Sequence, residues 1–144
     1  IQWVENYCDD RRKGEKFLTV LFEELIRIPN GNRRRCDVAI WVGLGRNPQS
    51  EDVPTITVEF VSKRAADIKR DYVDKRADYL AAGVQEYWIM DRFRRTLTAL
   101  RRKGRRWEDR VVQEGESYKT PLLPGFELDL AALLARADAI AEED

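Results

Sequence analysis

Apolar residues cluster in short runs over the first half of the chain, which predicts extended strands. A first strand is expected at 17–22, where β-branched and aromatic residues dominate, with a second short strand or an extension near 25–28 and a turn at 29–31. The next strand is predicted at 36–42. Residues 55–61 are apolar on both faces, which is typical of a strand in the centre of a sheet.

The second half of the chain combines a helix with further strands. Residues 65–82 contain no Gly or Pro, place apolar residues at helical spacing, and precede Gly83, a residue typical of a helix end. Three more strands and a terminal helix are predicted at 86–90, 96–100, 107–112 and 129–140. This order favours an α/β protein with a mixed central β-sheet flanked by helices.

The length of 144 residues, with 43% hydrophobic residues, suits a single core, so we expect one domain over residues 1–144. Ile1, Val4 and Cys8 recur at helical spacing, and the chain does not open with Met. We therefore expect the first residues to be the last turns of a truncated helix that begins upstream. Glu5 lies in this remnant.

Several classes of protein are disfavoured by composition. No apolar run approaches the roughly 20 residues that span a bilayer, and the chain does not open with a secretory pattern. Two cysteines and no histidine argue against a disulfide scaffold and a zinc site. We expect a cytoplasmic protein without a membrane partner.

The charges balance overall, with 26 basic and 26 acidic residues, but they are distributed unevenly. The segment 92–110 carries nine basic residues against Glu108 and Asp109, and Phe93 and Trp107 lie among them. Such a surface suits the phosphates and bases of nucleic acid. The alternative is a solvated hairpin whose two aromatic residues pack into the core. The candidate nucleic-acid-binding residues are Arg94, Arg95, Arg101, Arg102, Arg105 and Arg106.

Glu59 lies in the middle of the central strand predicted at 55–61. A buried carboxyl group without a partner shifts its pKa upward or requires a cation. A metal, a Lys or Arg, or a substrate is therefore expected beside Glu59. A structural ion pair or a partly exposed strand edge is the alternative.

Asp37 stands at the head of an otherwise apolar strand, and period-two alternation places it on one face with Ala39 and Trp41. If this strand neighbours the strand of Glu59, the two carboxylates converge. A carboxylate pair without His or Cys suits Mg²⁺ or Mn²⁺. The alternative for Asp37 is a strand-end residue that binds backbone N–H groups.

One stripe of the predicted helix is polar, because Asp67, Asp71, Lys75 and Tyr79 follow one another at intervals of four. This stripe is either a solvated face with a weak Asp71–Lys75 pair, or it turns Lys75 toward Glu59. In the second case Lys75 supplies a cation to the carboxylates, and Tyr79 contacts Lys75 or a phosphate.

Four segments match the signature of a known family: TVEFVS at 57–62, DYVDKR at 71–76 followed by Tyr79, AGVQEYWIMD at 82–91 and LPGFEL at 123–128. In these segments the chain resembles the Uma-two family, which is described as "putative restriction endonuclease". The resemblance extends over nearly the whole chain from about Val20. It implies the α/β PD-(D/E)XK restriction-endonuclease-like fold, in which a mixed sheet flanked by helices presents two acids, a lysine and one or two divalent metals.

The resemblance also implies roles for individual residues. Asp37 and Glu59 match the two acids, and with the main-chain carbonyl of Phe60 they would hold Mg²⁺ or Mn²⁺. The family moves the lysine to the following helix, where Lys75 is the best candidate and Lys63 a weaker one. This sequence departs from the classical pattern at Cys36, the place of the usual Pro, and at Val61, the place of the usual Lys.

The expected function is that of a metal-dependent endonuclease, in which Asp37, Glu59, Lys75 and Tyr79 hydrolyse phosphodiester bonds of nucleic acid, above all DNA. The alternative is a catalytically inactive nuclease-like domain that binds nucleic acid or protein. A homodimer is a further expectation, because the predicted helix at 129–140 suits self-association as well as a core position.

Overall fold

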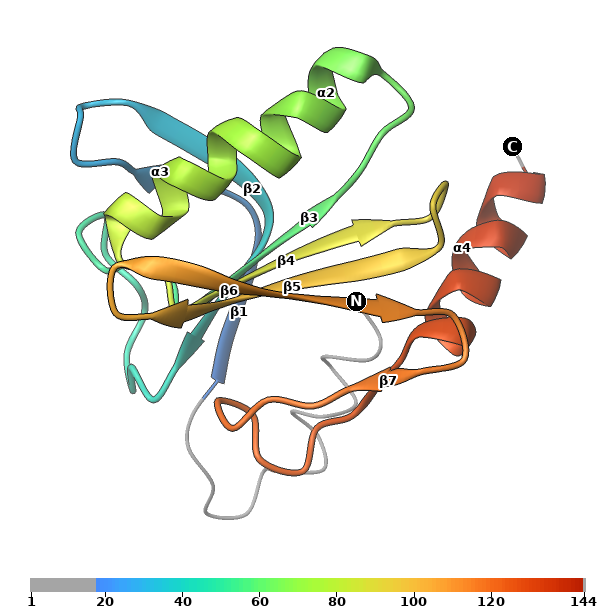
Figure 1. The fold of residues 1–144 in the computed structure, drawn as a ribbon. Helices are drawn as coiled ribbons and strands as arrows, with labels where there is room; N and C mark the ends of the chain where they lie inside the picture. The colour runs from blue at the N-terminus through green and yellow to red at the C-terminus, as the bar shows by residue number, and fades with distance from the viewer. Residues whose placement is uncertain (1–17, 144) are drawn as a thin grey trace.

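The computed structural model describes residues 18–143 and contains one six-stranded sheet in which each strand lies beside its neighbour in sequence (Figure 1). β3 and β4 are parallel, whereas the other neighbouring pairs of this sheet are antiparallel. The strands are β1 (Leu18–Arg27), β2 (Arg33–Val42), β3 (Ile56–Phe60), β4 (Glu86–Asp91), β5 (Thr96–Lys103) and β6 (Arg106–Gln113). The mixed sheet expected from the order of elements is thereby confirmed.

A helical segment connects the parallel strands β3 and β4 and covers one face of the sheet (Figure 1). It consists of α2 (Ala65–Lys69), a π-helical turn η1 (Arg70–Asp74) and α3 (Lys75–Ala82). Parallel neighbouring strands need such a crossover, because a tight turn cannot join them. The core between this segment and the sheet includes Ala39, Trp41, Tyr79, Tyr87 and Ile89, all buried.

The opposite face of the sheet is covered by the C-terminal part of the chain. The small strands β7 (Ser117–Tyr118) and β8 (Leu128–Asp129) pair with each other, and the helix α4 (Leu130–Glu143) follows. Leu130 and Leu134 of α4 are buried against the sheet, whereas Ile140 is exposed. β7 and β8 were not among the predicted strands, because two residues are too few for a periodicity to be visible.

The predicted strands and helices are otherwise present, with shifted ends. The two expected extended segments near 17–22 and 25–28 form the single strand β1, which contains Glu23 at a φ of 53°. β2 begins at Arg33, three residues before the predicted start. The predicted N-terminal helix remnant, with Glu5, lies outside the described residues. None of the helices in the described part of the chain is long and apolar enough to cross a bilayer.

The crossover helix ends at Gly83, whose φ of 99° lies in the left-handed region. A β-carbon at this position would meet no heavy atom within 4 Å, so a side chain would add backbone strain without a clash. Gly83→Ala is therefore expected to lower the free energy of unfolding by about 1–2 kcal/mol. Urea denaturation measures this change. A loss below about 0.3 kcal/mol would show that the helix end relaxes to another conformation.

Candidate active site

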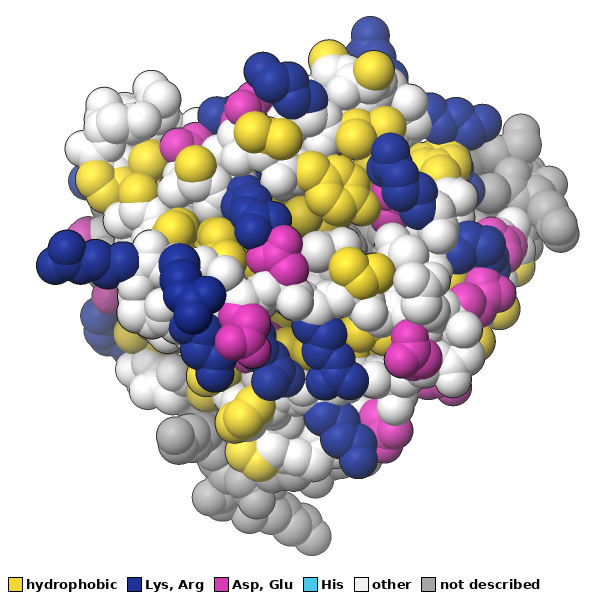
Figure 2. Space-filling model, in the orientation of Figure 1, with side chains coloured by type: hydrophobic (Ala, Val, Ile, Leu, Met, Phe, Trp, Pro, Cys, Tyr) yellow, Lys and Arg dark blue, Asp and Glu magenta, His cyan; other side chains and the backbone are white. Residues whose placement is uncertain are grey.

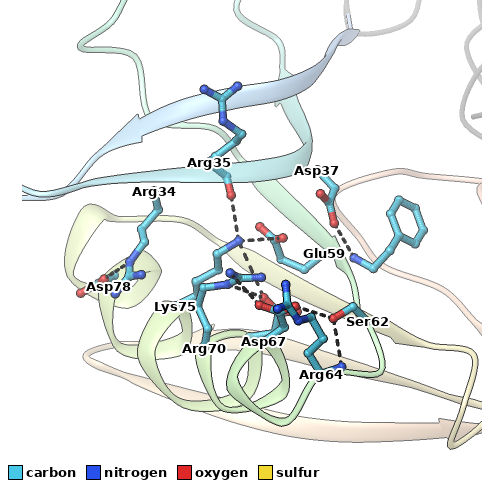
Figure 3. A network of polar contacts seen from close by, with 12 residues as sticks. Arg34, Arg35, Asp37, Glu59, Ser62, Arg64, Asp67, Arg70, Lys75 and Asp78 are labelled. Carbon is cyan, nitrogen blue, oxygen red and sulfur yellow. Dashed lines mark hydrogen bonds and ion pairs between the residues drawn. The ribbon is translucent and has the colours of Figure 1, made fainter.

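Glu59, near the end of the central strand β3, is 2% exposed and is held by two residues of α3. Its Oε2 lies 2.8 Å from Lys75 Nζ, and its Oε1 accepts a 2.9 Å hydrogen bond from the Tyr79 hydroxyl (Figure 3 shows the ion pair). Both carboxylate oxygens of Glu59 thus have a partner from the helix. Tyr79 was expected to contact Lys75 or a phosphate, and the structure places its hydroxyl on Glu59 instead.

Asp71, Lys75 and Tyr79 are buried between the helical segment and the sheet, so this part of the stripe is not the solvated face that was the alternative, whereas Asp67 at its start is partly exposed. Four residues of α-helix turn about 40° beyond one full turn, so positions four apart drift around the surface. The π-helical turn Arg70–Asp74 contains more residues per turn and offsets part of this drift. The backbone N–H of Lys75 accordingly donates to the carbonyl of Arg70, five residues earlier.

The ammonium group of Lys75 has two further contacts. It donates a 2.8 Å hydrogen bond to the main-chain carbonyl of Arg35 in β2, and it lies 3.7 Å from Asp71 Oδ1 (Figure 3). Lys75 therefore joins the helix to two strands of the sheet at the point where Glu59 and Asp37 lie. Arg35 contributes through its backbone, while its guanidinium donates to the carbonyl of Glu23.

Asp37 lies where the pairing between β2 and β3 stops. The register pairs Val38 with Val58, so the next step would place Asp37 opposite Glu59, beyond the last pair of this ladder. Instead, Asp37 Oδ2 accepts a 2.7 Å hydrogen bond from the backbone N–H of Phe60. This contact is the backbone interaction considered as the alternative for Asp37, and it occurs beside Glu59.

The pairing of β2 with β1 is also interrupted at this point. Phe22 pairs with Val38 and Glu24 with Cys36, which leaves Glu23 and Asp37 outside the register between them. Glu23 has the left-handed φ of 53° noted above, a conformation that costs free energy in a non-glycine residue. The sheet therefore opens on both sides of Asp37.

The opening is a pocket of about 340 Å³ between β2, β3 and the helix, lined by Arg33, Arg34, Arg35, Asp37, Glu59, Phe60, Arg70, Asp71 and Lys75. Within it, burial raises the pKa of Glu59 to about 7, although the charge of Lys75 opposes the shift. Burial likewise raises the pKa of Asp71. The Oδ1 atom of Asp71 is buried without a hydrogen-bond partner, although Lys75 Nζ and Arg70 Nε each lie 3.7 Å away.

The structure thus brings Asp37, Glu59, Phe60, Lys75 and Tyr79 together. Asp71, Arg33 and Arg70 also belong to this pocket, and sequence reasoning did not place them there. The interval of four between Asp71 and Lys75 was a usable signal, but on a regular exposed helix it indicates only a weak ion pair. The pocket position of Arg33 depends on how β1 and β2 curve, for which the sequence contains no local signal.

Most of the arginines expected to contact nucleic acid have partners within the protein. On the face seen in Figure 2, Lys and Arg side chains alternate with Asp and Glu side chains. Arg94 pairs with Asp91, Arg95 with Glu114 and Asp138, Arg101 with the Tyr118 hydroxyl, and Arg102 with the carbonyls of Leu80 and Val84. Arg105 and Arg106 are exposed in the β5–β6 hairpin.

These arginines are divided between the two opposite ends of the sheet. Arg94 and Arg95 follow β4 and lie at the end where β3 terminates beside the pocket, because β3 and β4 are parallel. Arg105 and Arg106 lie at the opposite end, because β5 runs antiparallel to β4. Trp107 is buried in the core and Phe93 is 40% exposed. The structure does not gather the six arginines around the pocket.

A mixed sheet whose parallel pair is joined by a helix, with two acids on the sheet and a lysine on the helix, has the α/β fold of PD-(D/E)XK-like nucleases. A solved structure described as "a putative nuclease belonging to DUF820", from Anabaena variabilis ATCC 29413, has this fold in common with the chain. The TM-score is 0.69 at 14% sequence identity, over 92% of this chain and 78% of that chain.

The chain belongs to the Uma2 family, as the resemblance predicted. The model of this family, described as "Putative restriction endonuclease", matches residues 1–131. A search of curated proteins gives no match. Family and fold together support a nuclease, a hydrolase that acts on nucleic acid.

The residues of the pocket fit a hard divalent cation in their chemistry. Two carboxylates and a nearby main-chain carbonyl are oxygen donors of the kind that Mg²⁺ and Mn²⁺ prefer. The buried Asp71 Oδ1 is a further oxygen without a hydrogen bond at the same pocket. Among the residues described, no three Asp, Glu, Cys or His side chains already surround one point, and Lys75 is the cation now paired with Glu59.

Proposed function

We propose that the protein is an Mg²⁺- or Mn²⁺-dependent endonuclease that hydrolyses phosphodiester bonds of DNA at the pocket between β2, β3 and α3. The observation that carries the proposal is the buried pair of Glu59 and Lys75 beside Asp37, in a pocket that is open to solvent. Buried charged groups are costly, and in a pocket they are a frequent mark of a reactive site. Family and fold point to the same class of reaction.

In this proposal, Asp37, Glu59 and the main-chain carbonyl of Phe60 hold the cation. When bound, such a cation supplies a water molecule that is more acidic than bulk water and neutralises the charge that develops on the phosphate. Asp37 is already oriented by the Phe60 N–H, and Tyr79 orients Glu59 through its hydroxyl.

Lys75 has the central role among the remaining groups. Its ammonium donates hydrogen bonds, so it positions the attacking water and stabilises negative charge on the phosphate oxygens. To act there it exchanges its contact with Glu59 for contacts with water and phosphate. Asp71 lies on the same side at 3.7 Å, and its unbonded Oδ1 is available to the displaced ammonium.

The decisive experiment is calorimetric titration of Mn²⁺ into the native protein and into Glu59→Gln, which keeps the shape of the side chain and removes its charge. We expect binding to the native protein and its loss in Glu59→Gln. Glu127→Gln, which alters an exposed glutamate of the C-terminal segment, is the matched control and is expected to bind normally. Equal binding by Glu59→Gln would contradict the proposed metal site.

Cleavage is tested next, with plasmid and oligonucleotide DNA in Mg²⁺ or Mn²⁺ and with Asp37→Ala as the inactive variant. Mn²⁺ binding without cleavage of any DNA or RNA would favour the alternative of a nuclease-like binding domain. The departures that keep this alternative open are Cys36 at the place of the usual Pro and Val61 at the place of the classical lysine, both buried. Self-association stays a prediction, and light scattering at high protein concentration measures it.

A further inference from the structure

Five cationic side chains line the same pocket as the three carboxylates. They are Arg33, Arg34, Arg35, Arg70 and Lys75, and the carboxylates are Asp37, Glu59 and Asp71. A bound divalent cation would increase the excess of positive charge. The pocket therefore suits an anionic ligand that brings several charges of its own.

Three of these cations are already engaged within the protein. Lys75 contacts Glu59, Arg34 forms a 2.6 Å ion pair with Asp78 on α3, and the Arg35 guanidinium donates to a carbonyl of β1. Figure 3 shows the Arg35 guanidinium directed away from Lys75. The two remaining cations of the pocket are Arg33, which has no ion pair with a described residue, and Arg70, whose ion pair with Asp67 lies at the surface.

Arg33 is exposed at the start of β2 and has no ion pair with any residue that the structure describes. The side chain of Arg70 is 44% exposed and lies 3.0 Å from Asp67 and 3.7 Å from Asp71. A guanidinium carries five N–H donors, so these contacts leave several of them for a ligand. Both residues reach the pocket from different elements, β2 and the π-helical turn.

A third cation continues this surface beyond the pocket. Lys63 lies three residues after the end of β3, is exposed, and has no ion pair within the described part of the chain. Its Nζ lies 5.7 Å from the centre of the Phe93 ring, which belongs to the turn after β4. Arg33, Arg70 and Lys63 thus lie toward the end of the sheet where Glu59 is located, whereas the exposed Arg105 and Arg106 lie at the opposite end.

We propose that Arg33 and Arg70, with Lys63 beside them, bind the phosphates of the nucleic-acid backbone and thereby position the strand over Asp37 and Glu59. This inference rests on the proposed function and assigns its substrate-binding surface. The ligand is a polyanion with phosphates at regular spacing, because two guanidinium groups on separate elements suit two phosphates better than one small anion. In this proposal Arg33, Arg70 and Lys63, and not the arginines of the β5–β6 hairpin, make the main electrostatic contact with the nucleic acid.

The test is the salt dependence of binding, measured by fluorescence anisotropy with a labelled DNA duplex and a labelled single strand in EDTA, where no cleavage occurs. Each lost phosphate contact lowers the slope of log K against log salt by roughly 0.7–0.9. The double substitution Arg33→Gln and Arg70→Gln is therefore expected to reduce the slope by about 1.5 and to weaken binding at low salt.

The matched control is the double substitution Arg105→Gln and Arg106→Gln, which removes the same charge from exposed positions at the other end of the sheet. We expect its slope to be that of the native protein. The inference is overturned if the control lowers the slope as much as the pocket variant does, or if the native protein binds neither DNA. Arg33→Gln alone alters a position without an ion pair, so it tests the inference even if substitution of Arg70 impairs folding. We expect it to reduce the slope by half as much as the double variant does.

The two proposals fail in distinguishable ways. Normal Mn²⁺ binding and cleavage with unchanged DNA affinity in the Arg33 and Arg70 variant would contradict the assigned surface alone. If the native protein binds no Mn²⁺ but the Arg33 and Arg70 variant binds DNA more weakly than the native protein does, only the proposed metal site is contradicted.

Discussion

Replacing Lys75 by methionine is expected to lower the free energy of unfolding by about 2–3 kcal/mol at pH 9, and by much less at pH 5. Lys75 is the cation paired with Glu59 at 2.8 Å, and the side chains of both residues are nearly inaccessible to solvent. Methionine has a similar length and no charge, so the substitution leaves a buried carboxylate with the Tyr79 hydroxyl as its remaining partner.

The pH dependence follows from the direction of the pKa shift. Burial raises the pKa of Glu59 from 4.5 to about 7 while Lys75 opposes it, so removal of Lys75 moves this pKa higher still. Because the folded state then holds its proton more tightly than the unfolded state, stability falls as pH rises between the unfolded and folded pKa values. Relative to the native protein, the loss begins near pH 7, where Glu59 of the native protein ionises, and it grows with pH up to the higher folded pKa of the variant.

Urea denaturation at pH 5 and pH 9 measures both values. Lys69→Met, which removes an exposed lysine from the same helical segment, is the control and is expected to change stability by less than about 0.5 kcal/mol. The double variant Glu59→Gln with Lys75→Met removes both charges and should recover much of the loss at pH 9. An equal loss at both pH values would show that packing, not the charge of Glu59, determines the effect.

Replacing Glu86 by alanine is expected to lower the free energy of unfolding by about 3–5 kcal/mol, a second large effect at a site far from the pocket. Glu86 is buried at the start of β4 and accepts hydrogen bonds from Trp88 Nε1 at 2.9 Å, from the Tyr118 hydroxyl and from Thr120. Tyr118 and Thr120 belong to the C-terminal segment, so this carboxyl group holds that segment against the sheet.

The matched control for Glu86 is Glu127→Ala, because Glu127 accepts a hydrogen bond from Ser117 in the same segment but is exposed. We expect it to cost less than about 1 kcal/mol. Thermal unfolding and the near-ultraviolet circular dichroism of Trp88 and Tyr118 report the two losses. Similar costs for both variants would mean that burial of Glu86 adds nothing to its role.

The sequence predicts the sheet well because its central strands β3 and β4 are buried on both faces and the helix between them has a clear period. Alternation also assigns Asp37 and Glu59 each to a face of its own strand, and their convergence follows once β2 and β3 are neighbours. The sequence does not reveal the interruption of both ladders at Asp37, since that depends on the backbone of Glu23, a residue that resembles any other polar position of a strand.

The partners of the basic residues were harder to predict for a physical reason. Arg95 pairs with Asp138, 43 residues away, and Arg34 pairs with Asp78, 44 residues away. A run of basic residues shows where charge is placed along the chain, whereas its neutralisation depends on tertiary contacts. For the same reason the polar stripe offered Lys75 as one of two alternatives beside Glu59, and the family resemblance favoured it.

The π-helical turn Arg70–Asp74 has an evolutionary consequence. A strand offers two directions for a side chain, so inserting one residue before Glu59 would turn it to the other face of the sheet. A helix accepts an inserted residue as a wider turn and rotates the following side chains in smaller steps. A lineage that carries its lysine on the helix can therefore adjust the direction of that lysine by single insertions while the strand with its glutamate stays unchanged.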